Sequence, residues 1–189
     1  MRKVTRQVAF EPGGWTPERA GKVAALFDSL AAEWHTRDHH HRMAPLADAF
    51  ARGGPMPVGT CLELGSGAGL VSAWLAARVS SVVAIDLSAG MLRLAPAGPA
   101  RRVRADAADL PVATGSAATA VLVNMLLFPA EIDRVLVPSG VLIWVNTSGE
   151  RTPIHLSADD VERAMPGDWD GVTSEAGWGT WTVLRRARD

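Results

Sequence analysis

Three glycines within five residues follow an apolar run in CLELGSGAGL, residues 61–70. Gly65, Gly67 and Gly69 leave a turn that is nearly bare backbone. Glycine is used where φ is positive or where something must approach the main chain closely. We therefore expect a ligand to lie against this turn.

Three carboxylates end or accompany three successive runs of this kind. Glu63 precedes the glycine turn, Asp86 ends SVVAID, and Asp106 ends RRVRAD. A carboxylate at a strand tip can accept hydrogen bonds from both hydroxyls of a ribose, whereas an acid beside the turn would repel a phosphate. Taken alone, Asp106 can equally be a helix cap or a solvated chain end. The three acids together favour a cationic ligand group over a pyrophosphate.

The glycine spacing also separates two cofactor classes. A dinucleotide fingerprint reads G-x-G-x-x-G, and its third glycine lets helix and strand pack around a pyrophosphate. Here the third glycine comes one residue early, and Leu70 occupies its place. The chain has no tyrosine, so the Tyr-x-x-x-Lys pair of an oxidoreductase is missing too. An NAD(P)-dependent oxidoreductase is therefore the less favoured alternative.

The elements that must position these residues alternate between strands and helices. Five runs read as strands buried on both faces of a parallel sheet: VGTCLEL, SVVAID, RRVRAD, TAVLVN and GVLIWVN. LVSAWLAARV and AEIDRVL between them have helical periodicity. This order predicts an open α/β sheet with right-handed crossovers. Ligands bind such sheets beyond the carboxyl ends of the strands, where the glycine turn falls.

The two ends of the chain predict different structures. Residues 1–15 read as an irregular arm, and Thr16 can then cap a helix whose end carries Trp34, which can cover a ligand or pack in the core. A second helix is expected over MAPLADAFARG. At the other end, Ser157 can cap LSADDVERAM, and the turn around Trp178 can join DGVTSEA and TWTVLRRA into an antiparallel hairpin.

The composition is that of an ordinary globular domain. The 189 residues are 48% apolar and 21% charged, with a formal net charge of −1. This balance offers no basic surface for nucleic acid, and no run approaches the ~18 apolar residues of a membrane span. The lone Cys61 excludes an internal disulfide, and the basic N-terminus lacks the apolar run of a signal peptide. We expect a soluble, cytoplasmic protein that binds neither nucleic acid nor membrane.

The motifs, in their order, resemble those of a known family. ELGSGAG, AIDLSAGML, RADAADLP and RVLVPSGVLIWV look like successive motifs of class I S-adenosylmethionine-dependent methyltransferases. The closest subtype is the small-molecule group, methyltransferase type 11, that includes quinone-biosynthesis enzymes. The resemblance covers roughly residues 58–146, and FDSLAAEW is similar to that subtype's leading helix.

This resemblance implies a fold and a domain organisation. The fold is α/β, a Rossmann-like open sheet of seven strands that is parallel but for one strand, with helices on both faces and an antiparallel C-terminal hairpin. Residues 1–189 would form a single methyltransferase domain. Within it, residues 1–54 would supply an arm and lid helices, and residues 55–189 the cofactor-binding core.

The resemblance also implies how the methionine half of S-adenosylmethionine is held. Glu63 would hold the ammonium group, directly or through water, and Asn124 would line the floor where the sulfonium meets the acceptor. The turn would lie under the methionine chain. Its residues are Gly65, Ser66, Gly67 and Gly69.

The adenosine half would be bound by the residues that follow the next two strands. Asp86 would bind the ribose hydroxyls, and Asp106 would accept a hydrogen bond from the adenine amino group. Leu87 and Met91 would pack beside the adenine, and Ala107 would lie along the ring.

The sequence departs from the subtype at three places. Thr119 stands where an aspartate usually opens the fourth strand, and the familiar PGG is Pro138-Ser139-Gly140. Scarcely any spacer separates LLFP from RVLVPSG, so the fourth crossover is short. Because this region commonly helps to cover the substrate, the short crossover leaves the shape of the acceptor pocket unassigned. It does not affect the predicted cofactor site.

The implied reaction is in-line displacement of the sulfonium methyl by an O, N, C or S nucleophile of a small, partly apolar organic acceptor. The alternative is an S-adenosylmethionine-binding regulatory or non-methylating protein. No catalytic residue is assigned and no metal is expected, because adjacent histidines cannot all converge on one ion. Nucleic-acid methylation is disfavoured because Asn124 lacks a following Pro-Pro-aromatic motif. The candidate bases are His35, His39, His40, His41 and His155.

Overall fold

A computed structural model describes residues 2–36 and 43–187. The elements that precede the fourth strand are α1 (Arg2–Phe10), α2 (Pro17–Leu30), η1 (Ala31–Thr36), α3 (Met43–Arg52), β1 (Thr60–Leu64), α4 (Leu70–Ala76), β2 (Ser81–Asp86), α5 (Ala89–Leu94) and β3 (Arg101–Arg104). The remaining elements are β4 (Ala117–Val123), α6 (Pro129–Val135), β5 (Leu136–Asn146), η3 (Gly149–Arg151), α7 (Ala158–Ala164), β6 (Trp169–Ala176) and β7 (Gly179–Arg186).

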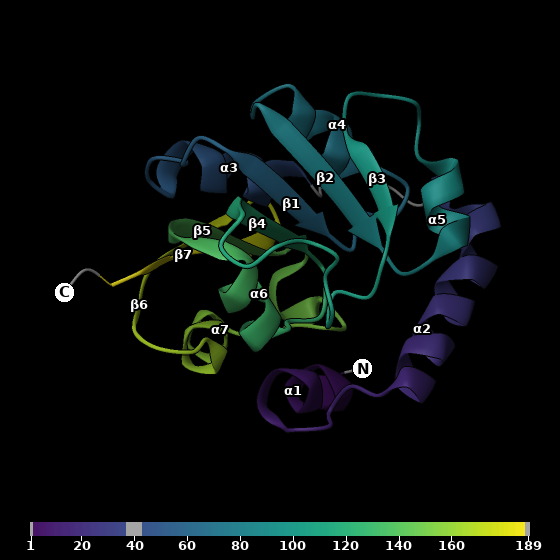
Figure 1. Cartoon of the computed structure of the whole chain (residues 1–189), viewed down its shortest axis with the longest axis horizontal. Helices are drawn as coiled ribbons and strands as arrows, with labels where there is room; N and C mark the ends of the chain where they lie inside the picture. The colour runs from purple at the N-terminus through teal and green to yellow at the C-terminus, as the bar shows by residue number, and fades with distance from the viewer. Residues whose placement is uncertain (1, 37–42, 188–189) are drawn as a thin grey trace.

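The strands form one 7-stranded sheet in the order β3-β2-β1-β4-β5-β7-β6 (Figure 1). Strands β1 to β5 pair with their neighbours in parallel, and β7 lies antiparallel to both β5 and β6. β7 is therefore the one strand that opposes the rest. This confirms the predicted Rossmann-like α/β fold with its C-terminal hairpin. The β3 run is not buried on both faces as predicted, because it is the edge strand and three of its four residues are exposed.

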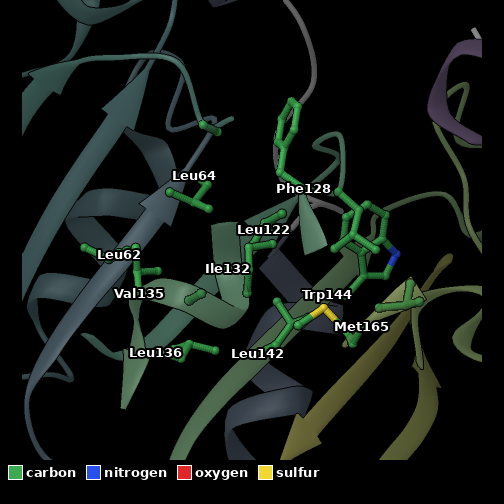
Figure 2. Packing of buried hydrophobic residues seen from close by; sticks show 14 of the residues in the cluster. Leu62, Leu64, Leu122, Phe128, Ile132, Val135, Leu136, Leu142, Trp144 and Met165 are labelled. Atoms are coloured by element: carbon green, nitrogen blue, oxygen red, sulfur yellow. The ribbon is translucent and has the colours of Figure 1, made fainter. Parts of the chain in front are cut away.

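Helices cover both faces of the sheet and enclose two apolar clusters. The first cluster includes Leu62, Leu122 and Trp144 of the sheet with Ile132 of α6 and Met165 after α7 (Figure 2). The second lies on the other face, between the sheet and helices α3 and α4. Burying one such leucine or isoleucine side chain contributes roughly 1.5–3 kcal/mol. The clusters hold the carboxyl ends of β1, β2 and β4 in fixed relative positions.

The N-terminal segment is a helix, so the prediction of an irregular arm is wrong. α1 buries Thr5, Val8 and Ala9, and Arg6 donates a hydrogen bond of 2.5 Å to Asp160 of α7. A helix of nine residues is marginal in isolation. Its sequence shows no long apolar stripe, and its helical state therefore depends on tertiary packing that periodicity does not reveal.

The other predicted helix starts are confirmed. Thr16 Oγ1 accepts a hydrogen bond of 3.2 Å from the backbone N–H of Arg19, and Ser157 Oγ accepts one of 3.1 Å from Asp160. α6, with 7 residues, spans the crossover between β4 and β5 and confirms that it is short. No helix within the described ranges is long and apolar enough to cross a membrane.

Candidate functional site

A cavity of about 740 Å³ opens at the carboxyl ends of β1, β2 and β4. Its lining has two parts. The part that we call the acidic side carries three carboxylates and comes from the ends of β1, β2 and β3 and the segments after them, with lining residues between positions 63 and 73, 85 and 96, and 105 and 107. The part that we call the apolar side comprises Val23, Ala24, Phe27, Trp34, Met125, Leu126, Thr152, Pro153 and Ile154.

All of the residues that the sequence suggests for cofactor binding line this one cavity. They are Glu63, Gly65, Ser66, Gly67, Gly69, Asp86, Leu87, Met91, Asp106, Ala107 and Asn124. They come from four different strand ends, so the fold brings together groups up to 61 positions apart in the chain. Their roles toward a ligand stay predictions.

The glycine turn connects β1 to α4 in a left-handed path. Gly65, Gly67 and Gly69 have φ values of +73°, +55° and +81°, a region that residues with a Cβ rarely adopt. The N–H groups of Gly65 and Ser66 both donate to the carbonyl of Ile85, at 2.9 and 3.0 Å. The turn is therefore attached to the end of the neighbouring strand β2.

Only the middle glycine leaves open space in front of the turn. A Cβ on Gly65 would lie 2.6 Å from Sδ of Met125, and one on Gly69 would lie 2.9 Å from Cβ of Ala95. A Cβ on Gly67 would meet nothing within 4 Å. The absence of a side chain at Gly65 and Gly69 thus makes room for neighbouring protein atoms, whereas Gly67 exposes bare backbone to the cavity.

Asp86 is fixed at the end of β2 by backbone donors. Gly67 N–H donates to Oδ2 and Ser88 N–H to Oδ1, each at 2.8 Å. Burial raises the pKa of Asp86, and these hydrogen bonds act against that rise. Each carboxylate oxygen retains a further lone pair, so the group can accept from two more donors in the cavity.

Glu63 lies deeper in the cavity and is only 3% exposed. Ser72 of α4 donates a hydrogen bond to its Oε2. Burial raises the pKa of Glu63 to about 8, and the nearby Asp86 acts in the same direction. Glu63 is therefore largely protonated at neutral pH, and a cation beside it would favour its ionised form.

Asp106 is hydrogen-bonded to Trp15, a residue that the sequence analysis does not place in the site. Trp15 donates its indole N–H to Oδ2 of Asp106 at 2.8 Å, and the N–H of Ala108 donates to Oδ1 at 2.9 Å. Trp15 also packs edge-on against Phe128, with ring centroids 5.3 Å apart. Both aromatic residues line the cavity.

Asn124 lies in the floor but its side chain is occupied. Its Nδ2 donates to Oγ1 of Thr147 at 2.7 Å, and its Oδ1 accepts from the N–H of Thr147 at 2.9 Å. Its φ of +51° is left-handed, which asparagine tolerates better than most residues. Asn124 therefore links the end of β4 to the residue after β5. It lines the cavity as expected, but its side-chain amide is already hydrogen-bonded within the protein.

Of the predicted base candidates, only the side chain of His155 lies within the described residues. His155 follows the lining residues 152–154 but is not itself among them, and burial lowers its pKa. His39, His40 and His41 lie outside the described residues, as does the side chain of His35. Within the described ranges, no group of three or more His, Cys, Asp or Glu residues could hold a metal ion.

Helix α2 and η1 supply two aromatic residues to the cavity, of which the sequence suggested Trp34 as a possible cover of the ligand but did not suggest Phe27. Phe27 and Trp34 face the cavity as an edge-on pair with centroids 6.0 Å apart. Asp28 accepts hydrogen bonds from Ser88 Oγ at 2.5 Å and Gly90 N–H at 2.7 Å, and so fastens α2 to the start of α5. Figure 1 shows α2 running alongside α5. A long-range pairing of this kind has no sequence motif.

Comparisons with known proteins agree with this geometry. A family model described as a methyltransferase domain matches residues 62–144. The DhpI–SAH complex superposes with a TM-score of 0.71 at 18% identity and covers 90% of this chain and 98% of that one. A SAM-dependent methyltransferase from Aquifex aeolicus superposes with a TM-score of 0.63 at 16% identity, covering 92% and 100%.

A third similar structure is the Haloferax volcanii protein solved with the Trm112 methyltransferase activator. It has a TM-score of 0.67 at 16% identity and covers 86% of this chain and 98% of that one. No curated protein sequence is detectably similar to the chain.

The sheet order, the glycine turn and the family-model match are together those of a class I methyltransferase that uses S-adenosylmethionine. The family model described as a methyltransferase domain matches residues 62–144, the segment that carries the glycine turn and all three cavity carboxylates. Two features of the cavity fit the cofactor. Gly67 leaves room against the backbone, and Ser66 Oγ is buried without a hydrogen-bond partner among the described residues.

Proposed function

We propose that the protein transfers the sulfonium methyl of S-adenosylmethionine to a small, partly apolar organic acceptor by in-line displacement. The observation that carries this proposal is the division of one cavity into an acidic side and an apolar side. The cofactor supplies an activated methyl group, and the protein has to hold the acceptor in line with it. Orientation of this kind can lower a barrier by roughly 7–11 kcal/mol.

The acidic side would hold the cofactor through groups that are already oriented. Asp86 would accept from both ribose hydroxyls, since its carboxylate is held by Gly67 and Ser88. Glu63 would stabilise the ammonium group, and Ser66 Oγ is available to the methionine end. Asp106 would accept from the adenine amino group. Leu87, Met91 and Ala107 would pack on the adenine, and Gly65 and Gly69 would shape the turn.

The apolar side would hold the acceptor. Phe27 and Trp34 of the leading helices line the cavity together with residues 152–154, and the described lining contains no histidine, lysine, arginine or cysteine. A phenol or quinol suits such walls better than a carboxylate does, because a buried anion without a cationic partner is costly. We propose a small-molecule acceptor and a single domain, in which residues 1–54 supply an N-terminal arm and lid helices and residues 55–189 form the cofactor-binding core.

Thermal melts test the cofactor, and turnover tests the reaction. S-adenosylmethionine and its demethylated product should raise the melting temperature by mass action, and NADPH should not. A panel of phenols, quinols and carboxylic acids should then show methylation of the uncharged members. Stabilisation without turnover across such a panel would favour the non-methylating alternative, and stabilisation by NADPH alone would favour an oxidoreductase.

A further inference from the structure

A residue outside the family-matched segment 62–144 hydrogen-bonds to a carboxylate of the cavity. Among the described residues, Trp15 is the only one that does so. It follows the two glycines of GGW, in a segment without any recognised motif. Its indole N–H reaches Asp106 across 91 positions of the chain. The contact therefore forms only when the chain folds, and it orients Asp106, which lines the cavity.

The structure fixes Trp15 from both sides. α1 packs into the first apolar cluster before it, and α2 begins two residues after it. The turn between them is compact, because a Cβ on Gly14 would lie 2.0 Å from the carbonyl oxygen of Gln7. Arg19 of α2 donates to the carbonyl of Gly14 and to Gln7 Oε1. The position of the indole is therefore set by α1, α2 and the compact turn between them.

The hydrogen bonds to Asp106 leave its carboxylate able to accept further hydrogen bonds. A carboxylate accepts about four hydrogen bonds, and one on each oxygen is already used, by Trp15 and by Ala108. A carboxylate with a donor on each oxygen cannot rotate without losing one of them. The remaining lone pairs are thereby held in a fixed orientation at the cavity wall.

We propose that Trp15 is a positioning residue that orients Asp106 toward the 6-amino group of the adenine and so sets the base specificity of the cofactor site. This inference rests on the proposed role of Asp106. A base with an oxo group at position 6 offers an acceptor to a fixed carboxylate, and the two repel each other. Discrimination against such a base then depends on the orientation that Trp15 maintains.

Calorimetry compares the affinities of S-adenosylhomocysteine and S-inosylhomocysteine, in which the 6-amino group is replaced by an oxo group and N1 gains a proton. Trp15→Phe should reduce the preference for the adenine compound roughly tenfold, the range expected for a hydrogen bond to a charged group. Trp15→His, which keeps a ring N–H, should retain more of the preference. Trp169→Phe is the matched control, because Trp169 donates its N–H to the carbonyl of Pro166 at 2.8 Å, away from the cavity.

Asp106→Asn separates this inference from the assignment beneath it. If that variant keeps the wild-type preference, Asp106 does not contact the adenine and the assignment fails. If it loses the preference while Trp15→Phe keeps it, only the role of Trp15 is overturned. Tighter binding by Trp15→Phe would also overturn the proposal, since the indole would then compete with the adenine. Melts of the ligand-free variants establish that each is folded, and the ratio of affinities is insensitive to a uniform loss of stability.

Discussion

On the acidic side of the cavity, the ends of β1, β2 and β3 and the segments after them supply the lining. The apolar side combines residues of α2 and η1 with residues that follow β4 and η3. The acidic side is fixed mainly by backbone hydrogen bonds between neighbouring strand ends, with Trp15 as a distant side-chain donor to Asp106. Gly65 and Ser66 donate to Ile85, and Gly67 donates to Asp86. The apolar side depends on contacts between distant segments, such as Asp28 with Ser88.

This difference indicates how the two sides can change independently. Strand ends in parallel order meet at one edge of a sheet, so the acidic side follows from topology once the strands form. Residues on α2 can be exchanged without altering the sheet, because Ala20 is the single buried residue of α2. We expect cofactor binding to respond to local substitutions on the acidic side, and the position of α2 to respond to its few attachments.

The largest effect is expected for Asp86→Ala. Loss of a charged acceptor for two ribose hydroxyls should weaken S-adenosylhomocysteine binding at least roughly 100-fold. The ligand-free melting temperature should change little, because removal of a buried carboxylate offsets the loss of its hydrogen bonds to Gly67 and Ser88. Calorimetry and thermal melts measure both. Asp170→Ala removes an exposed carboxylate of β6 and should alter neither, and unchanged affinity in Asp86→Ala would contradict the ribose assignment.

The same difference explains what the sequence could predict. The glycine turn and the three acids occupy short motifs, so Glu63, Asp86 and Asp106 could be placed at one edge of the sheet from the sequence alone. α1 and Trp15 were not predicted, because the buried face of this nine-residue helix is only Thr5, Val8 and Ala9 and because a single indole forms no motif. The fold was predictable except for α1 and the exposed β3 edge.

The three glycines allow a test of which positions serve the ligand and which serve the fold. Gly67→Ala should cost about 1–2 kcal/mol for its left-handed backbone, which lowers the melting temperature by roughly 2–8 °C in a chain of this size. It should also weaken S-adenosylhomocysteine binding roughly tenfold if the added methyl enters ligand space. Gly115→Ala is the matched control, since Gly115 has a φ of +61° and also has open space. Equal affinity in the two variants would mean that the ligand does not approach Gly67.

The pH dependence of binding sharpens the assignment of Glu63. Because its pKa in the ligand-free protein is about 8, binding an ammonium group below that pH should release a proton. Affinity should therefore rise between pH 6 and 8, by up to about tenfold per unit. Glu63→Gln should flatten this rise, and exposed Glu175→Gln should not. Calorimetry in two buffers of different ionisation enthalpy counts the protons, and no proton release in the wild type would exclude a direct charge contact.

Glu63 also predicts how stability varies with pH. Its folded pKa lies above the ordinary value of 4.5, so between these two values the folded state holds a proton that the unfolded state releases. The contribution of Glu63 to the free energy of unfolding should thus be fully present below pH 4.5 and fall as the pH rises toward 8. Ligand-free Glu63→Gln should lose this slope in denaturant titrations.

The smallest effect is expected at the attachment of α2, where Asp28 accepts from Ser88 and Gly90. These two donors hold the pKa of Asp28 below its usual range, and both act through Oδ1. Asp28→Ala should therefore speed hydrogen exchange of the backbone amides in residues 17–30 while leaving cofactor affinity nearly unchanged. Asp28→Asn keeps an oxygen at this position and should exchange more slowly than Asp28→Ala. Equal exchange in both variants and the wild type would mean that apolar contacts alone hold α2, and the apolar side would then be as firmly built as the acidic side.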